Sequence, residues 1–156
     1  MRIVTLIGYI ARYVAIYLLF ISIFVKGAYE KLTEEVPGFF LEGWAGTWAD
    51  SFPGLEASWR LAGLLEAAAA IILIVSVVML EWLPGKPKPV AKLGISIALV
   101  FFMMLAWGQQ LIGATDGIAN LWLYFGTALA AMIVIRNDEK DDASEESSGQ
   151  AVTTTA

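Results

Sequence analysis

Apolar residues dominate four long segments of this chain, and shorter polar segments separate them. The second and third segments, residues 59–83 and 90–112, contain few charges and exceed the roughly 20 residues that a helix needs to cross a hydrocarbon layer. The first and fourth, residues 13–29 and 118–135, are shorter. The pattern predicts an all-α membrane protein in which residues 1–136 form a four-helix transmembrane bundle.

Apolar residues also precede the first segment, but Arg12 interrupts them. A charge at the centre of a bilayer is costly, so we expect Arg12 to lie at the membrane surface. The first membrane helix then begins near Tyr13. Residues 3–10 are expected to lie along the membrane through an apolar face.

The net charge of −5 comes from the last 20 residues, because residues 1–136 contain nine basic and nine acidic side chains. Residues 137–156 have little apolar surface, which predicts a disordered acidic tail. Seven basic residues fall on the side of the membrane that holds both termini and three on the other side. The positive-inside rule therefore places both termini in the cytoplasm.

The loop at residues 32–58 is rich in aromatic side chains. Phe40, Trp44 and Trp48 follow one another at intervals of four, so a short helix would present all three on one face. Two interpretations remain open. The rings lie at the level of the lipid headgroups, as aromatic belts do, or they roof a site for a lipophilic ligand.

Five polar residues are expected in the half of the membrane next to this loop. A carboxylate at that depth needs a partner, and Lys26 is the nearest basic residue in depth, so we predict a contact between Lys26 and Glu66. The group is either a structural staple between helices or a site for the polar head of a lipophilic molecule such as a quinone. With the aromatic rings, the candidate ligand-binding residues are Lys26, Glu66, Gln109, Gln110, Asn120, Trp44 and Trp48.

The chain has no cysteine and no histidine. Thiol chemistry, imidazole bases, zinc sites and the usual ligands of haem and iron–sulfur clusters are therefore excluded for this chain alone. We expect no metal site and no intrinsic cofactor, and a bound quinone is the one cofactor that we consider. Catalytic residues are not identified.

Several short motifs resemble the DoxX family of small four-helix membrane proteins. They are Gly27 and Lys31 in Gly-Ala-Tyr-Glu-Lys-Leu, and Arg60-Leu-Ala-Gly-Leu-Leu-Glu66 at the start of an alanine-rich helix. The likeness covers residues 12–136, and residues 63–66 are its most specific part. It implies a protein of a bacterial or archaeal inner membrane, in some relatives a small subunit linked to quinone-dependent sulfur oxidation. This chain departs from the family in the spacing of Gly27 and Lys31 and in its aromatic loop, so no catalytic role is carried over.

The leading interpretation is an accessory or quinone-interacting subunit of an oxidoreductase assembly in the inner membrane. A first alternative is a non-enzymatic assembly or chaperone-like module that binds other membrane proteins through its small-residue faces and aromatic loop. A second is a carrier of small solutes or protons, which would require a hydrated path to both faces. The expected partners are the lipid membrane and either another membrane protein or a second copy of the chain, with no nucleic acid.

Overall fold

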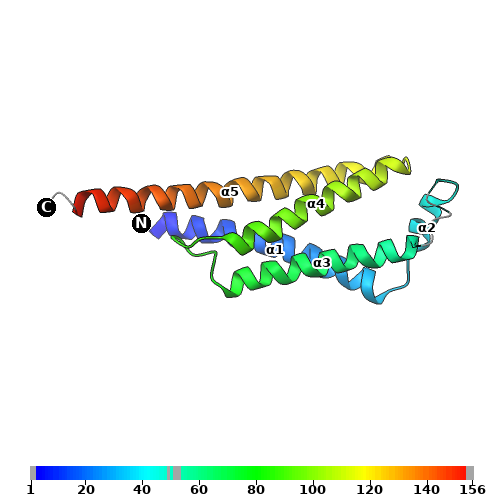
Figure 1. Cartoon of the computed structure of the whole chain (residues 1–156), viewed down its shortest axis with the longest axis horizontal. Coiled ribbons are helices and arrows are strands. Elements are labelled where there is room, and N and C mark those ends of the chain that lie inside the picture. The colour runs from blue at the N-terminus through cyan, green and yellow to red at the C-terminus, as the bar shows by residue number, and fades with distance from the viewer. Residues whose placement is uncertain (1–2, 49, 51–53, 154–156) are drawn as a thin grey trace.

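The chain forms four long helices and one short helix in a computed structural model that describes residues 3–48, 50 and 54–153. Side chains are described for residues 6–48, 50, 54–114, 117–142 and 144. The helices are α1 (Ile3–Thr33), α2 (Gly38–Trp44), α3 (Leu55–Val78), α4 (Pro89–Leu111) and α5 (Thr115–Thr153), and the described residues contain no strand (Figure 1). Four of the helices are long and apolar enough to cross a membrane. The prediction of an all-α membrane protein with four spanning helices is confirmed.

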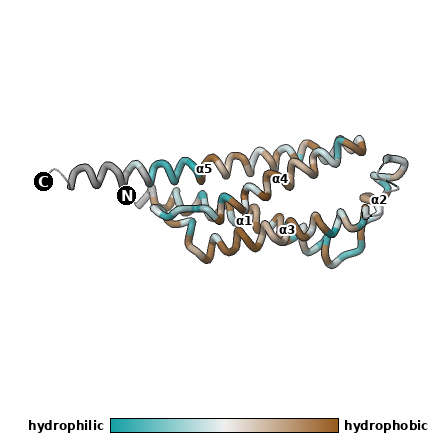
Figure 2. Tube along the Cα trace, viewed as in Figure 1, coloured by the Kyte–Doolittle hydropathy of each residue, from teal (hydrophilic) through white to brown (hydrophobic). Residues whose placement is uncertain are grey.

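The long helices lie side by side in chain order, with α1 along α3, α3 along α4 and α4 along α5. Both termini lie at one end of the bundle, the termini end, and α2 lies at the opposite end, the α2 end (Figure 1). The α1–α3 pair and the α4–α5 pair diverge toward the α2 end. Hydrophobic residues cover the middle of the bundle, while hydrophilic residues gather at residues 137–142 of α5 and in the connections between helices (Figure 2).

Local residue types explain where the helices begin and end. Pro89 occupies the first turn of α4, where a missing N–H costs nothing. Gly113 follows α4 with φ 68°, in the left-handed region that glycine adopts without strain. The third span therefore matches its predicted bounds within one residue. By contrast, α3 ends five residues before the predicted residue 83, because the chain turns through Leu80, which has φ 59°.

The first helix differs from its prediction. It runs without a break from Ile3, so residues 3–10 do not form a separate segment along the membrane surface. Arg12 is accommodated inside this helix because its Nη1 lies 3.3 Å from Oδ1 of Asp138 on α5. Its guanidinium carbon also lies 5.5 Å from the centre of the Tyr9 ring. Asp138, far from Arg12 in the sequence, therefore neutralises the charge of Arg12, which we had expected at the start of the first membrane helix.

The prediction of a disordered tail from residue 137 is wrong for the start of that segment, because α5 continues through it. Asp138 binds Arg12 of α1, and Glu139 binds Lys92 Nζ of α4 at 2.8 Å. Asp142 accepts hydrogen bonds from the backbone N–H of Gly85 at 2.9 Å and from Lys88 Nζ at 3.5 Å. The prediction of disorder rested on the small apolar surface of this segment alone. It did not include the ion pairs that form because the continuing helix brings these three carboxylates to basic side chains.

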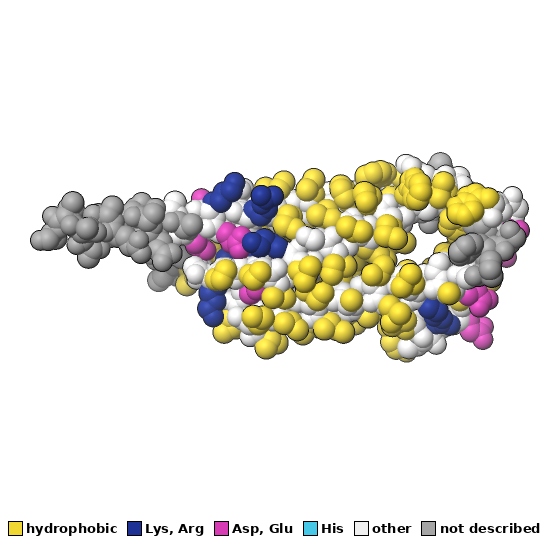
Figure 3. All heavy atoms as spheres, viewed as in Figure 1, with side chains coloured by type: hydrophobic (Ala, Val, Ile, Leu, Met, Phe, Trp, Pro, Cys, Tyr) yellow, Lys and Arg dark blue, Asp and Glu magenta, His cyan; other side chains and the backbone are white. Residues whose placement is uncertain are grey.

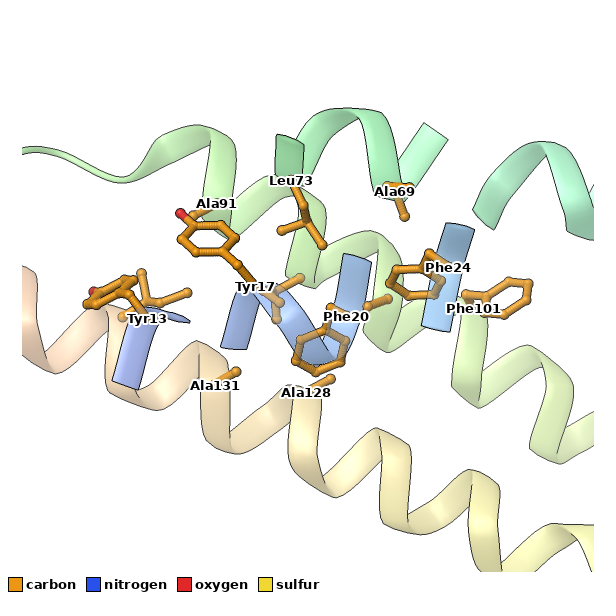
Figure 4. Close-up of a cluster of buried hydrophobic side chains, with 14 of the residues drawn as sticks. Tyr13, Tyr17, Phe20, Phe24, Ala69, Leu73, Ala91, Phe101, Ala128 and Ala131 are labelled. Atoms are coloured by element: carbon orange, nitrogen blue, oxygen red, sulfur yellow. The ribbon is translucent and has the colours of Figure 1, made fainter. Parts of the chain in front are cut away.

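Large aromatic side chains of α1 fill the core against small side chains of the other helices (Figure 4). Successive rings at intervals of three or four residues occupy one face of α1, where α3, α4 and α5 present mainly alanine. This fit allows close van der Waals contact, which drives helix association where the surrounding lipid is itself apolar. The rings are those of Tyr13, Tyr17, Phe20 and Phe24, and the facing small residues include Ala69, Ala91, Ala128 and Ala131.

Candidate functional site

A buried ion pair joins α1 to α3 near the α2 end of the bundle. Lys31 Nζ donates to both carboxylate oxygens of Glu66, at 3.0 and 2.9 Å. The side chains are 13% and 5% exposed. Breaking such a pair from one side leaves an uncompensated buried charge. Glu66 therefore has the partner that its position requires.

The partner is not the one that we predicted, so the Lys26–Glu66 contact is wrong. The Lys26 side chain is 77% exposed and pairs with Glu30 on the surface of α1, at 3.5 Å. Two facts explain the error. The first helix continues to Thr33, so Lys31 is still helical, and Lys31 lies four residues after Gly27 on the face that meets α3.

Two glycines make room for the ion pair. A Cβ atom at Gly27 would lie 2.5 Å from Oε1 of Glu66, and one at Gly63 would lie 2.7 Å from Cβ of Lys31. Each glycine therefore sits against the charged residue of the opposite helix. Because neither has a side chain, α1 and α3 approach closely enough for the carboxylate to lie between them.

The first turn of α3 adds two further contacts to Lys31. Arg60 Nη1 donates to the backbone oxygen of Lys31 at 2.7 Å, which satisfies one of the carbonyls left free at the end of α1. Trp59 places its ring 5.1 Å from Lys31 Nζ. The indole Nε1 of Trp59 is buried, and no residue in the described part of the chain accepts a hydrogen bond from it.

A cavity of about 410 Å³ lies beside this cluster, under the aromatic loop. Phe40 and Trp44 of α2 and Trp48 beyond it line the cavity together with Trp59. The Phe40 and Trp59 rings are in contact, with centres 4.8 Å apart. Figure 3 shows the molecule hollowed at the α2 end, where the α1–α3 and α4–α5 pairs diverge. The cavity is wide because the helix pairs diverge there, and α2 covers it.

Only two of the three aromatic residues that were predicted to share one helical face lie in a helix. Phe40 and Trp44 belong to α2, but the helix ends at Trp44, and Gly46 then reverses the chain with φ 73°. Trp48 is 73% exposed and still borders the cavity. Phe40 and Trp44 therefore lie over the cavity while Trp48 is largely exposed, so these positions do not decide between the aromatic belt and the roof over a site.

The cavity lining contains few polar groups. Lys31 and Gln109 line the cavity, whereas Glu66 does not. Lys31 uses two of its three N–H groups on Glu66, so one remains within the described structure. This N–H and the buried Nε1–H of Trp59 belong to two residues that line the mainly apolar cavity. Because Glu66 neutralises the charge of Lys31, these two N–H groups add little net charge to the cavity wall.

The predicted site residues separate into two groups. Gln109, Trp44 and Trp48 line the cavity, and Glu66 holds the lysine that borders it. Lys26, Gln110 and Asn120 are exposed and lie elsewhere.

Sequence reasoning missed Lys31 and Trp59 as site residues. The four-residue spacing of Gly27 and Lys31, beside the three-residue spacing of Gly63 and Glu66, is the signal that could have identified Lys31. We find no comparable signal for Trp59.

A second polar cluster occupies the termini end. Glu81, which is 3% exposed, accepts hydrogen bonds from the backbone N–H groups of Val90 and Ala91, at 3.1 and 2.7 Å, and so caps α4. It also accepts from Ser76 Oγ at 2.7 Å, and that hydroxyl is bonded to Tyr17 Oη at 2.7 Å.

A layer of buried apolar side chains separates this cluster from the Lys31–Glu66 pair. The core between them includes Phe20, Phe24, Ala69 and Leu73, all buried. A hydrated path through the bundle would have to displace these side chains, which argues against the carrier alternative.

Known proteins add no analogy for this site. Within the described residues, no group of three acidic side chains could hold a metal ion. No model of a protein family, no curated protein and no solved structure matches this chain. Its function is therefore inferred from the cavity and from the residues around it.

Proposed function

We propose that this multi-pass membrane protein binds the polar head of a lipophilic molecule in the cavity under α2, and that the molecule is a quinone. The observation that supports this most is that two residues of the cavity wall, Lys31 and Trp59, each have an N–H that no described residue accepts. A buried donor without a partner costs free energy. A ring carbonyl in the cavity would accept from Lys31, and from Trp59 once that side chain turns its buried Nε1 toward the cavity, which would remove that cost.

The charge around the cavity favours a neutral ligand over an anion. The bidentate contact with Glu66 already compensates Lys31, at 3.0 and 2.9 Å. An anionic head would therefore bring an uncompensated charge into a site at membrane depth, which is costly. A quinone carbonyl accepts hydrogen bonds without adding charge.

The size and lining of the cavity fit a flat ring. Ligand pockets commonly have volumes of roughly 300–1,000 Å³ and are lined by apolar and aromatic side chains with a few polar groups. This cavity, at about 410 Å³, has that composition, with Phe40, Trp44 and Trp59 available for contact with a ring. Gln109 of α4 also lines the cavity.

We further propose that the chain acts as an accessory subunit of a membrane oxidoreductase, as its resemblance to the DoxX family implies. The chain lacks cysteine and histidine, so electron transfer to or from the quinone would depend on a partner protein. The proposed location is an inner membrane with both termini cytoplasmic. The excess of basic residues at the termini end supports that orientation.

The proposal is tested with Trp59→Phe, which keeps the ring and removes the N–H. Equilibrium dialysis of the purified protein in a mild detergent, against the tailless naphthoquinone menadione, measures binding directly. One lost hydrogen bond of about 1 kcal/mol weakens binding about fivefold. Trp107→Phe is the matched control, because Trp107 is 65% exposed and does not line the cavity.

Two results would contradict the proposal. One is a native protein that binds no more menadione than empty detergent micelles do. The other is a Trp59→Phe variant with the affinity of the Trp107→Phe control.

A further inference from the structure

A second, smaller hollow adjoins the cavity. It has a volume of about 260 Å³ and lies between α3 and α4. Three residues line both spaces, namely Leu65 of α3 and Phe101 and Met104 of α4. Because both spaces share these residues, the smaller hollow lies directly beside the cavity, at the side of the bundle. We call it the α3–α4 groove.

The groove faces the surface that lipid surrounds. Val100 and Met104, which line it, are 53% and 54% exposed, and both lie within a spanning helix. From Ile97 to Met104 the groove follows α4 for about 10 Å, at 1.5 Å per residue. No charged side chain borders it. The groove is therefore suited to an apolar chain whose head lies in the neighbouring cavity.

A further large hollow on the described surface does not offer a path for such a chain. It has a volume of about 860 Å³ and follows α1 from Ile10 to Tyr29, with Val77 and Trp82 beside it. It shares no lining residue with the cavity. A molecule with its head beside Lys31 could not extend a tail directly into that hollow.

We propose that the α3–α4 groove holds the first part of the ligand's apolar tail, so that the ligand is a long-tailed lipid that enters sideways from the membrane. This inference rests on the proposed function, since it assumes a carbonyl head beside Lys31 and Trp59. It adds the class of ligand, a tailed molecule instead of a small ring, and the route by which the ligand enters. Neither follows from the polar groups of the cavity.

Photo-crosslinking maps the tail on the native full-length chain. The probe is a naphthoquinone with an isoprenoid tail that carries a diazirine near the head, and an excess of the same quinone without the diazirine defines specific labelling. We expect specific labelling within residues 96–104. Specific labelling within residues 10–29 instead, along the α1 hollow, would overturn the proposal.

Binding to a variant with a filled groove supplies the second measurement. Val100→Trp places an indole in the groove, and we expect it to weaken binding of the tailed quinone about tenfold while menadione binds as before. Leu123→Trp on α5 is the control, because Leu123 is 66% exposed and lines neither space. Both positions face lipid, so neither substitution is expected to prevent folding.

The outcomes separate this inference from the proposed function. If native protein binds menadione, but the tailed quinone binds equally well to Val100→Trp and Leu123→Trp, the tail route is wrong and the head site stands. If native protein binds neither quinone, the proposed function fails and the tail route fails with it.

Discussion

Gly27→Ala is expected to destabilise the bundle, although glycine is a poor helix former. A methyl group at this position would meet Oε1, Cδ and Oε2 of Glu66 at 2.5–2.7 Å, distances that real Cβ atoms do not show. The carboxylate, which is 5% exposed, must then move away from Lys31. The substitution therefore acts on the ion pair from the opposite helix without changing either charge.

The magnitude follows from two opposing effects. Replacing glycine by alanine inside a helix stabilises by about 1 kcal/mol. Breaking a buried ion pair costs about 3–5 kcal/mol. We expect a net loss of about 2–4 kcal/mol in the free energy of unfolding. Gly8→Ala, on the same helix and with open space around the added carbon, should show only the stabilising effect.

Reversible unfolding in mixed micelles, followed by circular dichroism, measures both variants under identical conditions. The test is the sign, because the same chemical change on one helix should destabilise at Gly27 and stabilise at Gly8. Equal stability of the two variants would show that Glu66 does not pack against Gly27. The geometry of the site would then be refuted.

Two further predictions concern the termini end. Glu81→Ala should lower the free energy of unfolding by about 3 kcal/mol, because it leaves two N–H groups of α4 and the Ser76 hydroxyl without their acceptor. Thermal unfolding compares it with Glu35→Ala at an exposed position, and equal melting temperatures would contradict the capping role. The triple variant Asp138→Asn, Glu139→Gln, Asp142→Asn should lose about 1–3 kcal/mol, since it removes the contacts of α5 with Arg12, Lys88 and Lys92. The control, Asp141→Asn, changes an exposed carboxylate in the same turn, and a triple variant as stable as this control would show that the start of the tail contributes nothing to the fold.

The four spanning helices were predictable because their signal is local. Each hydrophobic segment has to satisfy its own backbone hydrogen bonds in lipid, so length and hydropathy are enough to identify it. The bounds of α4 were within one residue for this reason, aided by Pro89 and Gly113. The second span was predicted four to five residues too far along the chain at both ends, and nothing in its composition marks the turn at Leu80.

The partners within the site were less predictable because they depend on helix rotation. Depth favoured Lys26 because the first helix was predicted to end near residue 29, whereas the rotation of α1 directs Lys31 and not Lys26 toward Glu66. The contacts of Arg12 with Asp138 and of Lys92 with Glu139 join residues far apart in the sequence. Hydropathy has no information on such pairs. The orphan N–H of Trp59 likewise depends on tertiary packing.

The most direct test of the central claim is mass spectrometry of the molecules that stay bound after gentle extraction from native membranes. The native chain is compared with Trp59→Phe and with the Trp107→Phe control. The account predicts a tailed quinone retained by the native chain and the control and depleted in Trp59→Phe. Retention of proteins alone, equally in all three, would contradict the account and favour an assembly module.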